Sequence, residues 1–264
     1  MALLTVALDI KNVTKIYEKP GSSTFGFAKR FVKVVDGVSL AINDSEIYGF
    51  LGLNGAGKTT TIKMVLGLIQ PTSGAVDIFG KDAREPASRA CLGFAPERSS
   101  FYDYLTAGEV LETLGGLSGM DQKTIRAKTP ELLELVALEG EDRTLVKNFS
   151  KGMQQRLGIA QSLLADPALL IFDEPTTGLD PFGRKIFKDL MVRLKGQGKA
   201  IFFSSHQLMD VQEICDRVGV IHRGKLVHEG PVAELVREGR TVEKWFIELL
   251  GQVDPGAKKP IQLD

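Results

Sequence analysis

A glycine-rich segment in the first quarter of the chain combines the residue types that bind phosphate groups. Residues 52–59 read Gly-Leu-Asn-Gly-Ala-Gly-Lys-Thr and match the pattern G-x-x-x-x-G-K-[ST]. The apolar run over residues 46–51 predicts a strand, and the apolar spacing over 58–68 predicts a helix. Glycines allow successive backbone N–H groups, and the N-terminus of the helix, to point at an anion. The segment therefore predicts a cradle for the phosphates of a nucleotide.

Two side chains of this loop have separate expected tasks. Lys58 would bridge the β- and γ-phosphates, which also makes it a catalytic candidate, and the Thr59 hydroxyl would ligate Mg²⁺. The loop residues that we expect to contact the nucleotide are Asn54, Gly55, Ala56, Gly57, Lys58, Thr59 and Thr60.

Two adjacent carboxylates follow another apolar run. Residues 168–172 read Ala-Leu-Leu-Ile-Phe and predict a strand, and Asp173 and Glu174 come directly after it. Two acids after a strand are, by themselves, a common solvated turn. Together with a phosphate loop they predict a hydrolytic site. Asp173 would hold Mg²⁺ through a water molecule, and Glu174 would polarise the attacking water as general base.

Strand-like and helix-like segments alternate along most of the chain. The alternation predicts an α/β fold whose mainly parallel sheet is covered on both faces. Together with the phosphate loop and the acidic pair, it indicates a P-loop ATPase core. A strand-like segment over residues 3–13 and another run that leads into residue 40 predict an antiparallel β-subdomain. Residues from about 98 to 156 predict an inserted α-helical subdomain. Residues 1–230 would form the nucleotide-binding domain, and 231–264 a short helical tail with a disordered end. Further strands are expected at 92–95, 200–204 and 217–221, and helices at 181–195 and 207–214.

Charge and hydropathy limit the possible partners. The chain has 33 Lys and Arg against 33 Asp and Glu, so no chain-wide basic field is present and we expect no nucleic-acid partner. No uninterrupted apolar stretch reaches the roughly 18 residues that a membrane-spanning helix needs. The N-terminal segment lacks the basic start of a signal peptide. We therefore expect a cytoplasmic chain that reaches a membrane only by docking on a partner.

The segment that precedes the acidic strand resembles the signature motif of the ABC ATPases. Residues 149–156 read Phe-Ser-Lys-Gly-Met-Gln-Gln-Arg. Ser150 and Gly152 match the serine and second glycine of the family's common Leu-Ser-Gly-Gly-Gln, whereas Phe149, Lys151 and Met153 depart from it. The retained pair places a hydroxyl and a glycine backbone at a helix N-terminus, where an anion can bind. Taken alone, the string also fits a simple helix cap.

Two more segments stand in the family's order after the acidic pair. Residues 176–180, Thr-Thr-Gly-Leu-Asp, resemble the D-loop, which gives Asp180 an expected place beside the nucleotide. Residues 204–206, Ser-Ser-His, resemble the segment with the family's switch histidine. The resemblance implies that His206 senses the γ-phosphate and takes part in catalysis.

Two further segments resemble the family less completely: one differs from its motif in a residue, and the other also fits a structural role. Residues 93–97, Gly-Phe-Ala-Pro-Glu, resemble the Q-loop but end in Glu97 instead of glutamine. A carboxylate there could ligate Mg²⁺ or water, and it adds negative charge beside the phosphates. Tyr17 stands where the family places an aromatic ring on the adenine. Local packing of a tyrosine at a strand end is the alternative.

The resemblance covers residues 3–230 and implies a mechanism. ATP with Mg²⁺ would bind between two such subunits paired head to tail, and the second ATP-binding subunit is expected to be another copy. A separate membrane-spanning permease would be the other partner, which places the chain at the inner face of the cell membrane. The motifs at 94–97 and 150–156 are more similar to those of bacterial exporters than of importers, so export is expected.

Other functions remain as alternatives. A non-transport ABC ATPase acting on nucleic acid or the ribosome would usually contain two cassettes or a long coiled coil, and the chain has neither. A P-loop kinase or GTPase would leave the signature-like segment unexplained. The segment with Phe25, Phe27 and Phe31 could touch a partner or the membrane surface, or form a surface loop. Trp245 and Phe246 are expected to pack on the body or a partner, and His222 and His228 to lie on the surface.

Overall fold

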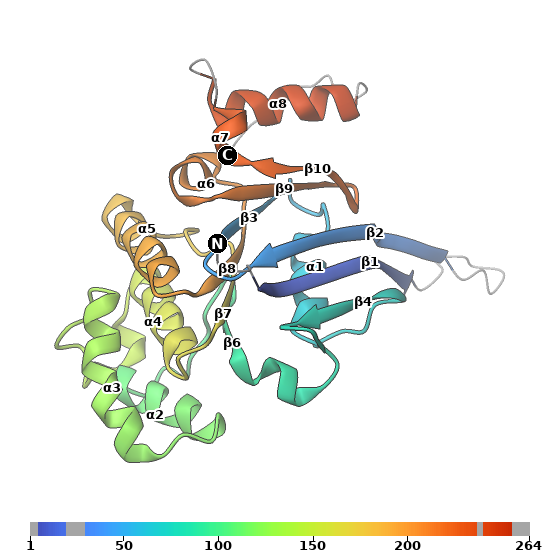
Figure 1. Ribbon diagram of the computed structural model, residues 1–264. Coiled ribbons are helices and arrows are strands. Elements are labelled where there is room, and N and C mark those ends of the chain that lie inside the picture. Colours follow the sequence, from blue (N-terminus) through green and yellow to red (C-terminus); the bar gives the residue numbers. More distant parts are fainter. Residues whose placement is uncertain (1–4, 20–29, 237–239, 255–264) are drawn as a thin grey trace, which may run out of the picture.

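The computed structural model describes residues 5–19, 30–236 and 240–254, and two β-sheets form its centre (Figure 1). The larger sheet has the strand order β10-β9-β3-β8-β7-β6. All its neighbouring pairs are parallel except β9 and β10, so the expected mainly parallel sheet is confirmed. Its strands are β3 (Ile47–Leu51), β6 (Leu92–Ala95), β7 (Leu169–Asp173), β8 (Ala200–Ser205), β9 (Arg217–His222) and β10 (Lys225–Pro231).

The central strands carry uninterrupted apolar runs because both of their faces are covered. Every residue of β3, β7 and β8 is buried. A smaller antiparallel sheet, in the order β2-β1-β4-β5, shares one core with these strands, and Tyr48, Phe50 and Phe202 lie in that core. Its strands are β1 (Val6–Lys19), β2 (Arg30–Asn43), β4 (Ser73–Ile78) and β5 (Lys81–Asp82).

Helices bury their apolar sides against both cores. Helix α1 (Lys58–Val65) contributes Ile62 and Val65 to the core between the sheets. It ends earlier than expected because Gly67 adopts a left-handed φ of 66° that terminates the helix. The second core contains residues of the helices α2, α3, α4, α5 and α6, and Figure 1 shows α2 and α3 below α4. These helices are α2 (Ala107–Leu117), α3 (Gln122–Leu135), α4 (Lys151–Leu163), α5 (Pro181–Gly196) and α6 (Leu208–Ile214).

Side-chain caps explain why several helices begin where they do. Thr106 and Glu109 form a reciprocal capping box at the start of α2. Asp121 accepts a hydrogen bond from the Thr124 backbone N–H at the start of α3. The helices α2 and α3 occupy the region that the sequence marks as helix-rich. The inserted helical subdomain remains our interpretation of that region.

The structure also differs from the sequence-based expectations. Strand β1 continues to Lys19, beyond the expected end at residue 13, and β4 and β5 were not expected. Short 3₁₀ helices η1 (Pro86–Cys91) and η2 (Val146–Asn148) add to the connections. The 20–30 insertion, apart from residue 30, and the tail end at 255–264 lie outside the described residues.

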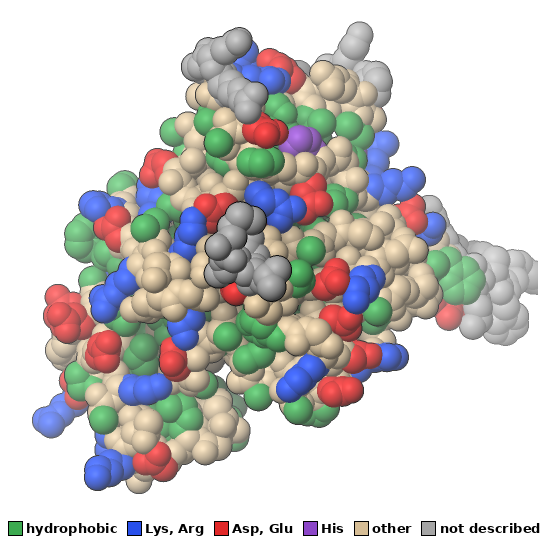
Figure 2. Space-filling view, in the orientation of Figure 1, with side chains coloured by type: hydrophobic (Ala, Val, Ile, Leu, Met, Phe, Trp, Pro, Cys, Tyr) green, Lys and Arg blue, Asp and Glu red, His purple; other side chains and the backbone are tan. Residues whose placement is uncertain are grey.

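Charged side chains of both signs are interspersed on the face shown in Figure 2. Ion pairs between partly exposed side chains, such as Lys11 with Asp77 at 2.6 Å, join charges of opposite sign. The absence of a broad basic surface on this face agrees with the balanced composition. None of the helices in the described part of the chain combines the length and apolar character that crossing a bilayer requires.

The C-terminal helix corrects one expectation. Helix α7 (Val232–Leu235) follows the β9–β10 hairpin, and α8 (Val242–Val253) lies over that hairpin (Figure 1). Trp245 is buried and meets the ring of His228 edge to face at 4.7 Å between ring centroids. His228 is half-buried beside Trp245, and the side chain of His222 is 11% exposed, so neither histidine lies fully on the surface as expected. Burial lowers the pKa of the His228 imidazole, an effect that the nearby Glu229 and Glu234 partly oppose.

Aromatic packing between α5 and the sheet allows a test of the core. Phe187 is buried and lies edge-on to Phe172 and Phe203, with ring centroids 5.6 and 6.1 Å away. We expect Phe187→Ala to lower the free energy of unfolding by about 3 to 5 kcal/mol, because it leaves a cavity. Urea unfolding would measure this change. The control is Phe182→Ala on the same helix, where the ring is 66% exposed; a change beyond about 0.5 kcal/mol there would contradict the assignment.

Candidate nucleotide site

A cavity of about 310 Å³ opens at the carboxyl ends of β3, β7 and β8. Ligand sites of open α/β sheets are typically found at this edge. It gathers nine of the expected site residues: Asn54, Gly55, Gly57, Lys58, Thr59, Thr60, Glu97, Glu174 and His206. Val34 and Leu53 complete its lining.

Glycines give the loop after β3 its shape. A Cβ atom on Gly52 would lie 2.5 Å from the carbonyl oxygen of Ile221, so only glycine allows the loop to pass β9 this closely. Gly57 has a φ of 117°, and a Cβ there would lie 2.9 Å from the Val34 carbonyl oxygen. Helix α1 begins at the next residue. The loop that leads into its N-terminus therefore follows a path that only glycines permit.

Lys58 is held across the mouth of this loop. Its ammonium nitrogen Nζ donates a hydrogen bond to the Gly52 carbonyl oxygen at 2.6 Å. The same nitrogen lies 3.1 Å from Oε1 of Glu174, and both side chains are less than a tenth exposed. A buried carboxylate is stabilised by such a cation. Lys58 therefore joins the phosphate loop to the end of β7.

Glu174 is fixed from several directions. Glu174 has a left-handed φ of 50°, which is uncommon for a residue other than glycine. Oε2 accepts hydrogen bonds from the His206 backbone N–H at 3.2 Å and lies 2.7 Å from Nδ1 of the His206 ring. Oε1 has no hydrogen-bond partner among the described residues, although the Lys58 ammonium lies beside it. This oxygen is the one left to accept a hydrogen bond from a ligand or water.

Ser204 connects the two carboxylates, and the sequence analysis did not assign it a role. Its hydroxyl accepts a hydrogen bond from the Glu174 backbone N–H at 2.9 Å and donates one to Oδ1 of Asp173 at 2.6 Å. Asp173 and Ser204 are both buried. Because β7 and β8 are neighbours with Asp173 opposite Ser204, the pairing could have been found only with the strand register known.

Some expected site residues do not line this cavity. Ala56 is buried within the loop, and Asp173 lies behind Glu174 with its Ser204 partner. Tyr17 lies on β1, where its ring is 37% exposed and has the Lys15 ammonium 5.2 Å from its centroid. An adenine-stacking role for Tyr17 stays a prediction.

The signature-like and D-loop-like residues form a separate group. Ser150 caps α4 by accepting a hydrogen bond from the Met153 backbone N–H, and Asp180 caps α5 by accepting one from that of Gly183. The two loops approach each other, since a Cβ atom on Gly152 would lie 3.6 Å from the Gly178 carbonyl oxygen. Ser150, Gly152 and Asp180 do not line the cavity of their own chain.

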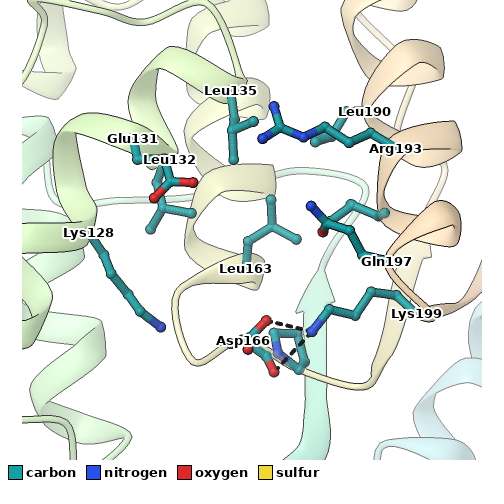
Figure 3. A pocket seen from close by; sticks show the side chains of 12 residues that line it. Lys128, Glu131, Leu132, Leu135, Leu163, Asp166, Leu190, Arg193, Gln197 and Lys199 are labelled. Carbon is teal, nitrogen blue, oxygen red and sulfur yellow. Dashed lines mark hydrogen bonds and ion pairs between the residues drawn. The ribbon is translucent and has the colours of Figure 1, made fainter.

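A second hollow, of about 430 Å³, lies between α3 and α5 with the end of α4 between them (Figure 3). Leucine side chains line it, and the ion pair of Lys199 with Asp166, at 2.5 Å, lies at its edge. None of the expected site residues lies in it. The chemistry therefore belongs to the cavity beside the phosphate loop.

The comparison with protein families decides the assignment. The model of the family described as "ABC transporter" matches residues 35–177. The chain belongs to the ABC transporter family. As a member of it, the chain is an ATP-binding subunit that hydrolyses ATP to power transport.

Curated relatives agree with this assignment. The ABC subunit is 46% identical over 213 residues to the bacitracin transport ATP-binding protein BcrA of Bacillus licheniformis, covering 79% of this chain and 68% of that protein. It is 38% identical over 230 residues to the ABC transporter ATP-binding protein NatA of Bacillus subtilis (strain 168), covering 86% and 93%. It is 35% identical over 240 residues to the Nod factor export ATP-binding protein I of Rhizobium meliloti, covering 90% and 68%.

Solved structures share the fold of the ABC subunit. An ATP-binding subunit of an ABC transporter superimposes with a TM-score of 0.78 at 29% identity, over 92% of this chain and 99% of that one. A dimeric ATP-binding cassette in a post-hydrolysis state, bound to ADP and phosphate, superimposes with a TM-score of 0.76 at 25% identity, over 85% and 98%. The fold class expected from the sequence is therefore confirmed.

The buried pair of Lys58 and Glu174 predicts a measurable coupling. In the nucleotide-free ABC subunit, Lys58→Ala should lower the free energy of unfolding by about 3 to 5 kcal/mol, because it leaves a buried carboxylate without its cation. Adding Glu174→Gln should recover part of this loss, which a double-mutant cycle by urea unfolding measures. The control pair is Lys185 with Asp189, whose side chains are 70% and 65% exposed; its coupling should stay below about 0.5 kcal/mol. Equal couplings for both pairs would contradict the analysis.

Proposed function

We propose that this chain drives an exporter, as one of two ATP-binding subunits that close head to tail on Mg²⁺ and ATP beneath a membrane-spanning permease. The observation that carries the catalytic part is the placement of Glu174. Its buried carboxylate faces the cavity between Lys58, 3.1 Å away, and His206, 2.7 Å away. A carboxylate in this position can take a proton from water that attacks a phosphate bound by the loop.

The two oxygens of Glu174 have different roles in this proposal. His206 holds Oε2 through its ring and its backbone N–H. Oε1 is then the oxygen that accepts the proton of the attacking water. When the γ-phosphate enters the loop, it attracts the Lys58 ammonium. The ammonium then pairs with the phosphate instead of the Glu174 carboxylate. His206, with a side chain that is 42% exposed, can contact the γ-phosphate from the other side.

Thr59 and Asp173 suit Mg²⁺ that arrives with the nucleotide. Among the described residues, no group of three His, Cys, Asp or Glu is placed to hold a metal ion without a ligand. In nucleotide sites, Mg²⁺ takes most of its ligands from phosphate oxygens and water, with few from the protein. Thr59 lines the cavity, and Asp173 is oriented by the Ser204 hydroxyl behind it. Bound there, Mg²⁺ would neutralise phosphate charge, with Glu97 as a further ligand of the ion or its water.

A second copy of the chain would complete the site. Ser150, Gly152 and Asp180 lie outside the cavity of their own chain but stand at helix N-termini, where an anion is favourable. Head-to-tail pairing would bring these residues of one copy to the phosphates bound by the other. The dimeric arrangement of the related cassette with ADP and phosphate supports this proposal.

Export and membrane attachment rest on the relatives. BcrA is named for bacitracin transport, and the Rhizobium protein for Nod factor export. We propose the same direction here, with the chain attached peripherally at the cytoplasmic face through its permease. A nucleic-acid target is not proposed.

The catalytic carboxylate can be tested directly. Glu174→Gln should reduce ATP hydrolysis by about a hundredfold or more, because the amide cannot accept the proton of the attacking water. With ATP and Mg²⁺ it should elute from size-exclusion chromatography as a stable dimer, while the unaltered chain returns to monomer as ATP is consumed. Glu213→Gln, at an exposed glutamate on α6, is the control. Hydrolysis by Glu174→Gln at the unaltered rate, without dimer, would reject this assignment.

The direction of transport has its own test. Cells whose only copy carries Glu174→Gln should accumulate the cargo or become sensitive to it, while nutrient uptake stays unchanged. Radiolabelled uptake and efflux assays in intact cells would measure both directions. A defect confined to uptake would overturn the proposal of export and leave the ATPase assignment standing.

A further inference from the structure

The segment that carries Glu97 is packed against α4 with unusual closeness. A Cβ atom built on Gly158 of α4 would lie 1.9 Å from Oγ of Ser99 and 2.9 Å from its Cβ. No side chain can be placed at 158 without moving Ser99, since both distances are below van der Waals contact. Gly158 lies inside the helix, where glycine is less favourable than alanine. The closeness of Ser99 provides a reason for a glycine at this position.

A hydrogen bond joins the same two elements one helical turn earlier. Gln155 is buried and its amide Nε2 donates to the carbonyl oxygen of Pro96 at 3.3 Å. Gln155 and Gly158 are three residues apart, so they lie on one face of α4. Pro96 and Ser99 are also three residues apart, on either side of Glu97. The segment is thus attached to α4 at two points.

The Ser99 contact is one of shape. Oγ of Ser99 is buried and has no hydrogen-bond partner among the described residues. A buried hydroxyl without a partner is unfavourable, so hydrogen bonding does not explain this contact. What Ser99 provides is volume that fills the space left open by Gly158.

We propose that Ser99 and Gly158 are positioning residues for Glu97. Their contact, together with the Gln155 bond, fixes how far the segment extends into the nucleotide cavity, and Glu97 lines that cavity. The inference rests on the proposed role of Glu97 beside Mg²⁺ and ATP. Because α4 begins after Ser150, the same contact links the Glu97 position to the helix end that the proposed dimer presents to the second nucleotide.

A size swap tests the contact in the full chain. Gly158→Ala overfills the space and Ser99→Gly empties it, so each should displace Glu97. The two changes together place the alanine methyl where the serine hydroxyl was. The affinity for a fluorescent ATP analogue is measured once with Mg²⁺ and once with EDTA in its place. The ratio of the two affinities is the gain that Mg²⁺ provides. Each single change should reduce this gain by about tenfold, and the pair should restore it.

Further variants separate positioning from general damage. Gly116→Ala on α2 is the matched control, since a Cβ there meets nothing within 4 Å. Glu97→Ala should reduce the Mg²⁺-dependent gain, and adding Gly158→Ala should reduce it no further, because Gly158 acts only through Glu97. Thermal unfolding checks that each variant is folded. If Gly158→Ala alone does not fold, the comparison of Ser99→Gly with the double variant decides.

The outcomes distinguish the inference from the proposed function. Folded single variants with the unaltered Mg²⁺-dependent gain, a double variant no better than Ser99→Gly, or additive effects of Glu97→Ala and Gly158→Ala would each overturn the positioning role. Failure of the proposed function would look different, because the unaltered chain itself would then show no gain in ATP affinity with Mg²⁺.

Discussion

A carboxylate withdrawn from water must have positive charge or hydrogen-bond donors beside it, and Glu174 is such a group. Its partners come from different parts of the chain: Lys58 is the first residue of α1, after the loop that follows β3, and His206 comes directly after β8. The strands β3, β8 and β7 are neighbours in the sheet, so their carboxyl ends bring the three side chains together. The parallel topology is therefore what makes the buried charge tolerable.

The same topology sets the shape of the phosphate loop. Gly52 lies so close to the Ile221 carbonyl oxygen that no side chain fits between them. Gly57 lies close enough to the Val34 carbonyl oxygen for a side chain to be excluded there too. Val34 belongs to β2 and Ile221 to β9, so the loop is confined by both sheets. The small antiparallel sheet thus supports the direction in which α1 begins. Its role in this part of the molecule is to shape the loop.

Much of this arrangement could be predicted from local patterns in the sequence. The rest depends on contacts between segments that are not adjacent in the sequence. The apolar runs and the glycine-rich loop predict the parallel core, because each of these patterns lies within a few consecutive residues and can be recognised without knowing the fold. Ser204 was missed, since its hydrogen bonds to Asp173 and Glu174 depend on the register of β7 with β8. The contact of Trp245 with His228 was missed because the two residues belong to separate elements whose packing no local pattern specifies. The closeness of Gly158 to Ser99 likewise has no local signal.

The separation of the site into two groups has a physical consequence. Lys58 and Glu174 form a buried pair of opposite charges within one chain. Ser150, by contrast, offers a helix N-terminus that lies outside this cavity. ATP adds negative charge that one Lys58 cannot balance while it also neutralises Glu174. In the proposed dimer, the partner's helix end supplies the missing positive potential, so nucleotide charge itself favours closure, and loss of the γ-phosphate removes that preference.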